Sequence, residues 1–366
     1  MGAGVPRMVF REDENMDYRF LGRSGLKVSA MAMGSFTFGG KGDFGMVGAQ
    51  DVAEAKALID CCLDHGVTLL DTANMYSTGL AEEILGAALA GRRDRVLISS
   101  KARMRIGEGP NDEGASRWHL IRECERSLKR LKSDHIDIYH IHEWDGVTPV
   151  EETMEALDTL RRDGKIRYAG CSNYTGWQLM KALGVSEREG LARFVTQQIH
   201  YTPEAREAEY ELLPISVDQG LGVTVWSPLA AGLLSGKHRR GAIAEGSRQA
   251  NGWTEPPIRD EARLWDIVDV LVEIGDAHGV DAAQVTLAWT LSRPAIASLV
   301  VGARTPAQME RNFRALDLTL SAEEMARIDA VSRPPMIYPH WHQAQFAAGR
   351  FGAAERVLHG EAPSGE

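Results

Sequence analysis

Cysteine is scarce in this chain, with four residues among 366, and none of the four stands in a C-x-x-C pair. The usual zinc and redox motifs need such pairs, so no metal site is predicted. Cys61 and Cys62 are adjacent, which is a poor geometry for a mutual disulfide. We therefore expect reduced thiols, as in a cytoplasmic protein, and no disulfide framework.

Long apolar runs and an excess of positive charge are also missing. No run approaches the roughly 20 residues that a membrane-spanning helix needs, and residues 1–10 lack the apolar core of a secretory signal. Lys and Arg number 41 against 51 Asp and Glu, a net charge of −10, which argues against a broad nucleic-acid surface. We expect a soluble cytoplasmic protein with a small-molecule partner and no membrane or nucleic-acid partner. Any anionic ligand must then meet local cations or helix N-termini.

Short apolar segments alternate with segments of helical periodicity through residues 17–332. Helical spacing is clear, for example, in Ile121, Cys124 and Leu128. Near-continuous apolar strands must be covered on both faces, so eight β-α units predict a single closed (β/α)8 TIM barrel. An open doubly wound sheet is the alternative. The expected strands are 28–35, 68–73, 96–101, 136–142, 168–172, 194–199, 222–226 and 298–302.

Several segments lie outside the eight units. Residues 1–16 are expected to form a flexible N-terminus, and residues 18–28 are typical of a β-hairpin. A polar loop spans 238–258. The C-terminal tail, residues 333–366, carries Trp341 among polar residues, and we expect it to line the substrate pocket.

Residues 40–45, GKGDFG, match the dinucleotide fingerprint G-x-G-x-x-G. The third glycine of a true fingerprint lies in a helix that packs on the preceding strand. Here helical periodicity begins only near Asp51, so we interpret the segment as a loop. A Rossmann dehydrogenase is the alternative that depends on this motif.

Four polar residues fall at or just after expected strand ends: Asp71, Tyr76, Lys101 and His142. The strand ends of a parallel barrel converge on one mouth, which would place all four around one pocket. Taken alone, Asp71 and Tyr76 would be a turn residue and a packed phenol. Together, Lys101 would lower the pKa of the Tyr76 phenol, with Asp71 holding the ammonium. His142 would orient a carbonyl oxygen that Tyr76 protonates while a hydride reaches the carbon.

The sequence resembles the aldo-keto reductase family from about residue 18 to 320, in the branch that contains potassium-channel β-subunits and related bacterial proteins. Six motifs carry the resemblance in order: DTANMY at 71–76 with EEILG at 82–86, SSK at 99–101, DIYHIH at 137–142, GCSNY at 170–174, WSPL at 226–229 and VGART at 301–305. The resemblance implies one barrel and reversible hydride transfer from NADPH to aldehydes or ketones. Its catalytic tetrad falls on Asp71, Tyr76, Lys101 and His142, with Tyr76 as general acid.

The resemblance also implies a set of NADPH contacts. Ser172, Asn173 and Gln198 would hold the nicotinamide carboxamide, and Trp226 would stack on the ring. A strap over the pyrophosphate and an adenosine end would be formed by Ser227, Leu229, Gly232, Ser235, Lys237, Gly302, Arg304, Gln308 and Asn312.

Residues 305–308, Thr-Pro-Ala-Gln, have the pattern of a capping box with proline at the first helical position. The helix N-terminus can receive a phosphate, and Arg304 offers a fork for a 2′-phosphate, which favours NADP over NAD. The chain departs from the family pattern at His140, where many members carry glutamine, at Glu143-Trp144, and at Arg311.

A second class of function fits the same resemblance. In the potassium-channel β-subunit branch, the fold binds a nucleotide and docks on a partner, so a nucleotide-binding regulatory subunit is the alternative to an enzyme. The sequence does not identify the substrate, the favoured direction or the oligomeric state, and a homo-oligomer stays open.

Overall fold

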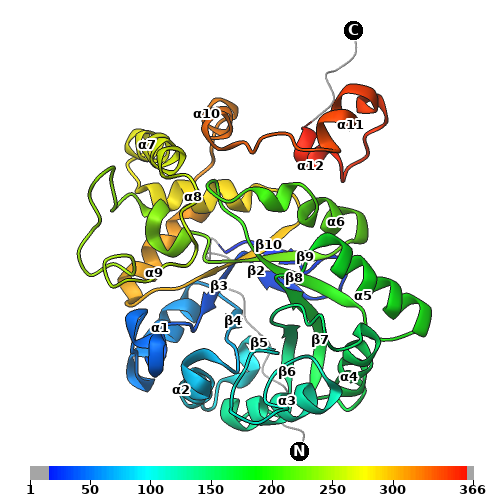
Figure 1. Cartoon of the computed structure of the whole chain (residues 1–366). Helices are drawn as coiled ribbons and strands as arrows, with labels where there is room; N and C mark the ends of the chain where they lie inside the picture. Colours follow the sequence, from blue (N-terminus) through cyan, green and yellow to red (C-terminus); the bar gives the residue numbers. More distant parts are fainter. Residues whose placement is uncertain (1–15, 361–366) are drawn as a thin grey trace, which may run out of the picture.

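Eight parallel strands close into a barrel in the computed structural model, which describes residues 16–360 (Figure 1). The predicted (β/α)8 fold is confirmed, and the open sheet is excluded because the first and last barrel strands pair with each other. In spatial order the strands are β10 (Ile296–Val301), β3 (Met31–Gly34), β4 (Leu69–Asp71), β5 (Leu97–Ala102), β6 (Ile136–Ile141), β7 (Ile166–Ser172), β8 (Phe194–His200) and β9 (Gly222–Trp226).

Helices surround this barrel, and capping residues explain several of their bounds. At the start of α1, the Asp51 side chain accepts from the amides of Ala53 and Glu54, while Glu54 accepts from the Asp51 amide. Ser116 caps α3, where its side chain accepts from the His119 amide. The helices are α1 (Val52–Asp64), α2 (Leu80–Ala88), α3 (Arg117–Leu131), α4 (Val150–Arg162), α5 (Gly176–Glu189), α6 (Leu212–Gln219), α7 (Glu261–His278), α8 (Ala282–Leu291), α9 (Pro306–Phe313), α10 (Ala322–Ser332), α11 (His340–Phe346) and α12 (Arg356–His359).

The N-terminal hairpin is present, but it divides the strand expected at 28–35. β1 (Tyr18–Phe20) pairs antiparallel with β2 (Lys27–Ser29), and the barrel strand β3 begins only at Met31. The Ser29 hydroxyl donates to the Met31 carbonyl at 2.6 Å, which stabilises the turn between the two strands. Leu21 in the hairpin is fully buried against the barrel interior. The hairpin therefore covers one end of the barrel and leaves the other as the mouth.

Other differences from the sequence prediction have local causes. Residues 207–219, between β8 and β9, form a short 3₁₀ turn followed by α6 and not one longer helix. Pro214 has no amide to donate and is tolerated only in the first turn of a helix, so α6 begins close to it. The fingerprint-like segment 40–45 is not a strand-to-helix turn. It runs into the 3₁₀ helix η1 (Gly42–Met46), which removes the basis of the Rossmann alternative.

The C-terminal tail is described up to residue 360. Its described part, residues 333–360, forms α11 and α12, and α12 packs on α6 (Figure 1). The rings of His340 and Tyr210 stack with centroids 5.4 Å apart. The expected flexible segment 1–16 lies outside the described residues except for Met16, which is buried. Among residues 16–360, no helix has the length and apolar character to cross a membrane.

Candidate active site

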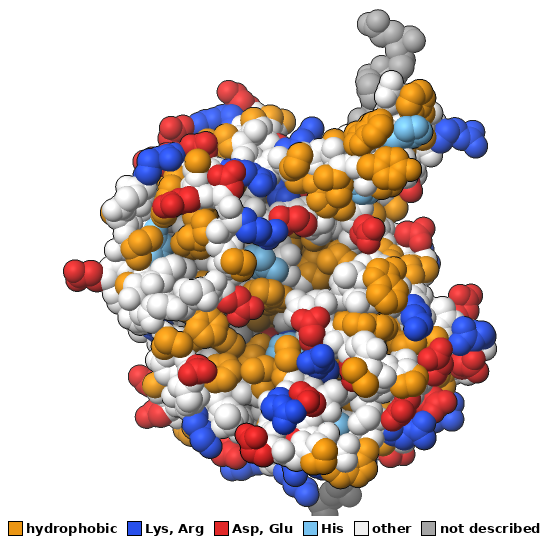
Figure 2. Space-filling model, in the orientation of Figure 1, with side chains coloured by type: hydrophobic (Ala, Val, Ile, Leu, Met, Phe, Trp, Pro, Cys, Tyr) orange, Lys and Arg blue, Asp and Glu red, His pale blue; other side chains and the backbone are white. Residues whose placement is uncertain are grey.

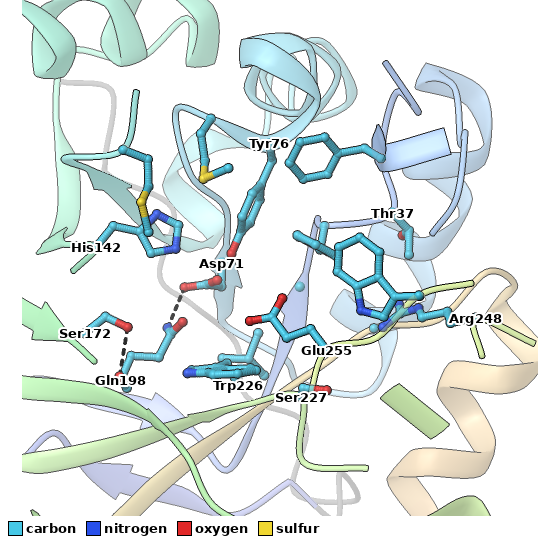
Figure 3. Close-up of a pocket in the computed structure, with 18 residues that line it drawn as sticks. Thr37, Asp71, Tyr76, His142, Ser172, Gln198, Trp226, Ser227, Arg248 and Glu255 are labelled. Atoms are coloured by element: carbon cyan, nitrogen blue, oxygen red, sulfur yellow. Dashed lines mark hydrogen bonds between the residues drawn. The ribbon is translucent and has the colours of Figure 1, made fainter. Parts of the chain in front are cut away.

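The barrel brings the four predicted polar residues to one mouth. Asp71 is the last residue of β4, Lys101 lies near the end of β5, and His142 directly follows β6. Tyr76 begins the 3₁₀ helix η2 (Tyr76–Gly79), in the loop after β4. Figure 3 shows Asp71, Tyr76 and His142 around the same pocket.

Lys101 contacts two other members of this cluster, Asp71 and Tyr76. Its fully buried ammonium forms an ion pair with the Asp71 carboxylate, donates to the Thr72 carbonyl at 2.9 Å, and donates to the Tyr76 hydroxyl at 3.4 Å. The second oxygen of Asp71 accepts from Ser99 at 2.8 Å and from Gln198 at 2.9 Å. Both charges are thus paired and hydrogen-bonded, as burial requires.

The electrostatics of Tyr76 differ from the sequence expectation. Burial raises the pKa of the Tyr76 phenol, and the opposing charge of Lys101 does not cancel that rise. Lys101 lowers the pKa of Tyr76 as expected, but burial outweighs it, so the net shift is upward and Tyr76 holds its proton at neutral pH. Burial also lowers the pKa of Lys101, but Asp71 and Tyr76 together hold it above its usual value, so the ammonium stays charged.

Two buried histidines are neutral: His140 within β6 and His142 directly after it. Burial and the neighbouring Lys101 lower the pKa of His140 to about 3 and that of His142 well below the ordinary value. The His142 side chain makes no hydrogen bond within residues 16–360, and it lines the pocket. A neutral imidazole there can donate one hydrogen bond to a ligand oxygen without competing as a base.

These depressed pKa values predict loss of stability in mild acid. Both histidines charge more easily in the unfolded chain, so their contribution is intact above about pH 6.5 and is lost as pH falls below it. Between pH 7.5 and 5.5 the two together should lower the free energy of unfolding by about 2–3 kcal/mol. Urea unfolding at the two pH values measures this. His140→Gln should remove about half of the difference, whereas the exposed His342→Gln should leave it unchanged; an equal pH dependence in both variants would contradict the assignment.

The pocket at the mouth encloses about 280 Å³. Figure 2 shows that face of the molecule hollowed near its centre, with apolar side chains around the hollow. The lining combines the polar cluster with aromatic and sulfur-containing side chains: Gly34, Phe36, Thr37, Phe44, Asp71, Met75, Tyr76, Met104, His142, Ser172, Gln198, Trp226, Ser227, Arg248, Trp253, Glu255, Val300 and Gly302. None of the described tail residues, 333–360, is among them, and a contribution of the tail to the substrate pocket stays a prediction.

A second hollow of about 330 Å³ continues from the first, sharing Thr37, Ser227, Arg248, Val300 and Gly302 with it. We call it the groove. Every residue expected for the pyrophosphate strap and the adenosine end lines it: Ser227, Leu229, Gly232, Ser235, Lys237, Gly302, Arg304, Gln308 and Asn312. Segments from β9 to α9 thus meet along one surface, as the resemblance implies.

Positive charge is concentrated in the groove. Lys237, Arg248 and Arg304 line it, and within the described residues none of the three forms an ion pair. We call these three the cation cluster. Burial, with Arg304 nearby, lowers the pKa of Arg248 to about 10; burial together with Arg248 and Arg304 lowers that of Lys237. Mutual repulsion of this kind, in a chain of net charge −10, suits the binding of an anion.

The three residues expected to hold the nicotinamide carboxamide make hydrogen bonds within the protein. Gln198 donates to Asp71, which leaves its side-chain carbonyl to accept, and the Ser172 hydroxyl donates to the Gln198 backbone at 2.9 Å (Figure 3). Asn173 does not line either hollow. Its amide donates to the His142 carbonyl at 3.2 Å and accepts from the Trp226 indole at 3.0 Å. Asn173 therefore links the indole of Trp226 to the backbone of His142.

The helix cap near Arg304 is only half of the expected box. The Thr305 hydroxyl accepts from the Gln308 amide, with Pro306 in the first turn of α9. The Gln308 side chain, however, accepts from the amide of Arg304 at 2.8 Å and not from that of Thr305. The cap thus fixes the backbone of Arg304 at the end of the groove.

Sequence reasoning missed several lining residues, above all Arg248, Trp253 and Glu255. All three belong to the 238–258 loop, which has no motif and no periodicity. Two of the residues that depart from the family pattern, Arg311 and Trp144, lie in different parts of the structure. Arg311 lines the groove, whereas Trp144 packs edge-on against Tyr174 at 5.1 Å and lines neither hollow.

The closed parallel barrel, with its acid, lysine, tyrosine and histidine cluster at the mouth, agrees with a family of oxidoreductases. The chain belongs to the aldo/keto reductase family, whose model matches residues 30–333. It is 39% identical over 313 residues to an Arabidopsis thaliana protein named probable voltage-gated potassium channel subunit beta, covering 83% of this chain and 92% of that protein. It is 34% identical over 327 residues to L-glyceraldehyde 3-phosphate reductase of Escherichia coli O157:H7, covering 86% and 92%. It is 31% identical over 344 residues to versiconal hemiacetal acetate reductase of Aspergillus parasiticus, covering 88% and 99%.

Proposed function

We propose that this protein is an NADPH-dependent reductase of aldehydes or ketones, reversible with the alcohols, in which Tyr76 is the general acid. The observation that carries the proposal is the contact of Lys101 with both Tyr76 and Asp71 in a pocket that continues into the groove. The names of the two reductases among the relatives support the reaction class.

The residues of the groove suit a phosphorylated dinucleotide. The cation cluster has no carboxylate partner within the described residues, so phosphates would satisfy charges that the protein leaves unpaired. Trp226, in turn, presents its ring to the pocket and is backed by His200, stacked at 4.5 Å. A dinucleotide lying along the two hollows would have Trp226 beside its nicotinamide ring and Lys237 and Arg304 beside its phosphates.

NADPH, when bound, supplies the hydride. The protein's own residues would then manage the substrate oxygen. His142 donates a hydrogen bond that orients the oxygen, and Tyr76 transfers its proton as negative charge develops there. Lys101 stabilises the phenolate that remains, since its ammonium lies 3.4 Å from that oxygen, and Asp71 keeps the ammonium directed at the hydroxyl. The raised pKa of Tyr76, caused by burial, keeps the proton in place until that moment.

Steady-state assays test the proposal directly. The protein should oxidise NADPH in the presence of at least one member of a panel of aldehydes, ketones and sugars, with formation of the alcohol. Binding of NADPH without turnover of any carbonyl would instead favour the alternative, a nucleotide-binding regulatory subunit. The similarity to the Arabidopsis thaliana protein motivates that second candidate.

Arg304 should determine the preference for NADPH over NADH. Its guanidinium is exposed at the end of the groove and donates only long hydrogen bonds, to the Gly246 carbonyl at 3.2 Å and the Val47 carbonyl at 3.4 Å. Arg304→Ala should weaken NADPH binding by about tenfold and leave NADH binding unchanged. Tenfold is the lower end for a charge-assisted hydrogen bond, because the site is open to water.

Fluorescence titration with the two nucleotides measures this difference. Arg314→Ala is the matched control, since Arg314 is also exposed but lies outside the groove. Equal losses for NADPH and NADH in Arg304→Ala would count against a 2′-phosphate contact.

A further inference from the structure

The substrate end of the pocket has an aromatic wall, which we define as Phe36, Phe44, Tyr76 and Trp253. Phe36 is its centre. The Phe36 ring meets Tyr76 at 4.9 Å, Phe44 at 5.2 Å and Trp253 at 5.7 Å between centroids, each edge-on. All four rings are partly exposed, so their surfaces are available to a ligand.

Glu255 lines the same pocket as this wall. The residue is partly open to solvent, but burial of its carboxyl raises the pKa of Glu255. Figure 3 shows the carboxylate directed into the space between Asp71 and Trp226. Within residues 16–360, Glu255 makes no hydrogen bond and no ion pair. It is nevertheless close to the reacting centre: burial is the main cause of the raised pKa of Tyr76, and the charge of Glu255 adds to it.

The other charges of the pocket are already matched. Asp71 is paired with Lys101, and His142 is neutral because burial lowers its pKa. Arg248 lies where the pocket meets the groove and belongs to the cation cluster, which phosphates would neutralise. Glu255 is then the one charge of the substrate end, among the described residues, without a counterion.

We propose that Glu255 and the aromatic wall select carbonyl substrates that carry an ammonium group and discriminate against anionic ones. A carboxylate beside electron-rich ring faces is the arrangement that attracts an alkylammonium ion, through its charge and through cation–π contacts. The same carboxylate repels a phosphate or carboxylate on the substrate. The inference rests on the proposed function, because it concerns the substrate of that same site.

Three benzaldehydes that differ only in the para substituent test it: trimethylammonio, methoxycarbonyl and carboxylate. Because the substituents also change carbonyl reactivity, the quantity to compare is the ratio of kcat/KM for the cationic and anionic aldehydes, in a variant relative to the unmodified protein. Reactivity cancels in that comparison. Glu255→Gln should lower the cationic-to-anionic ratio by about 10-fold to 100-fold, and Glu255→Lys should lower it further.

A binding measurement gives a second readout that needs no turnover. With NADP+ bound, benzyltrimethylammonium should quench tryptophan fluorescence at lower concentration than benzoate, since Trp253 and Trp226 line the pocket. Glu255→Gln should remove that difference. Glu245→Gln is the matched control, because Glu245 lies in the same loop but lines neither hollow.

The outcomes separate this inference from the proposed function. Reduction of none of the three aldehydes, or of any other carbonyl, by the unmodified protein with NADPH would overturn the proposed function. Reduction of the neutral aldehyde with a cationic-to-anionic ratio that is the same in Glu255→Gln as in the unmodified protein would overturn only the role of Glu255. A ratio that falls equally in Glu245→Gln would overturn it too, because the effect would then come from the net charge of the loop.

Discussion

Tyr76→Phe should reduce kcat for carbonyl reduction by about two to four orders of magnitude. The substitution keeps the ring, with its contacts to Phe36 and His142, and removes the proton and the hydroxyl that Lys101 contacts at 3.4 Å. NADPH affinity should barely change, because the lost interaction belongs to the transition state. Stopped-flow measurement of the hydride-transfer step is the appropriate readout, since it is independent of product release.

Tyr338→Phe is a suitable control for that experiment. Tyr338 is 73% exposed in the tail, far in the chain from the pocket lining, so loss of its hydroxyl should leave hydride transfer unchanged. Hydride transfer at near the original rate in Tyr76→Phe would remove Tyr76 from the role of acid. A raised dissociation constant for NADPH with an unchanged rate would instead place the hydroxyl in cofactor binding.

Lys101→Met should affect both activity and stability. The ammonium is completely buried, and its removal leaves the Asp71 carboxylate with only Ser99 and Gln198 as partners. Breaking a buried pair in this way costs about 3–5 kcal/mol, because one charge stays buried without compensation. We expect kcat to fall as severely as in Tyr76→Phe, since the phenolate formed during reduction loses its cation.

The double variant Asp71→Asn with Lys101→Met separates the two effects. Removing both charges should recover much of the free energy of unfolding, measured in urea, while activity stays low. Recovery of activity along with stability would show that Lys101 serves the fold alone.

Combining Lys101→Met with Tyr76→Phe should lower the hydride-transfer rate little beyond either single change if the two residues serve one proton transfer. Fully additive losses would contradict that coupling.

The barrel was predictable because its determinants are local and repeated. Each strand is a short apolar run, and each helix carries its own periodicity and, in cases such as Asp51 and Ser116, its own cap. The division of the expected strand 28–35 was not visible in the sequence, because its residues are apolar on both sides of the break. Only pairing with different partners, the hairpin on one side and the barrel on the other, distinguishes Val28 from Met33.

The sequence by itself determined the barrel, the family and the positions of Asp71, Tyr76, Lys101 and His142, since residues at the ends of parallel strands must converge on one mouth. The tertiary structure decided what depends on distance and burial. It reversed the expected direction of the Tyr76 pKa, because desolvation outweighs the charge of Lys101, and proximity alone could not reveal that balance. It also placed Glu255 in the pocket and packed α12 of the tail against α6, because the 238–258 loop and residues 333–360 have no periodic pattern. Only their packing against the rest of the chain fixes where they lie.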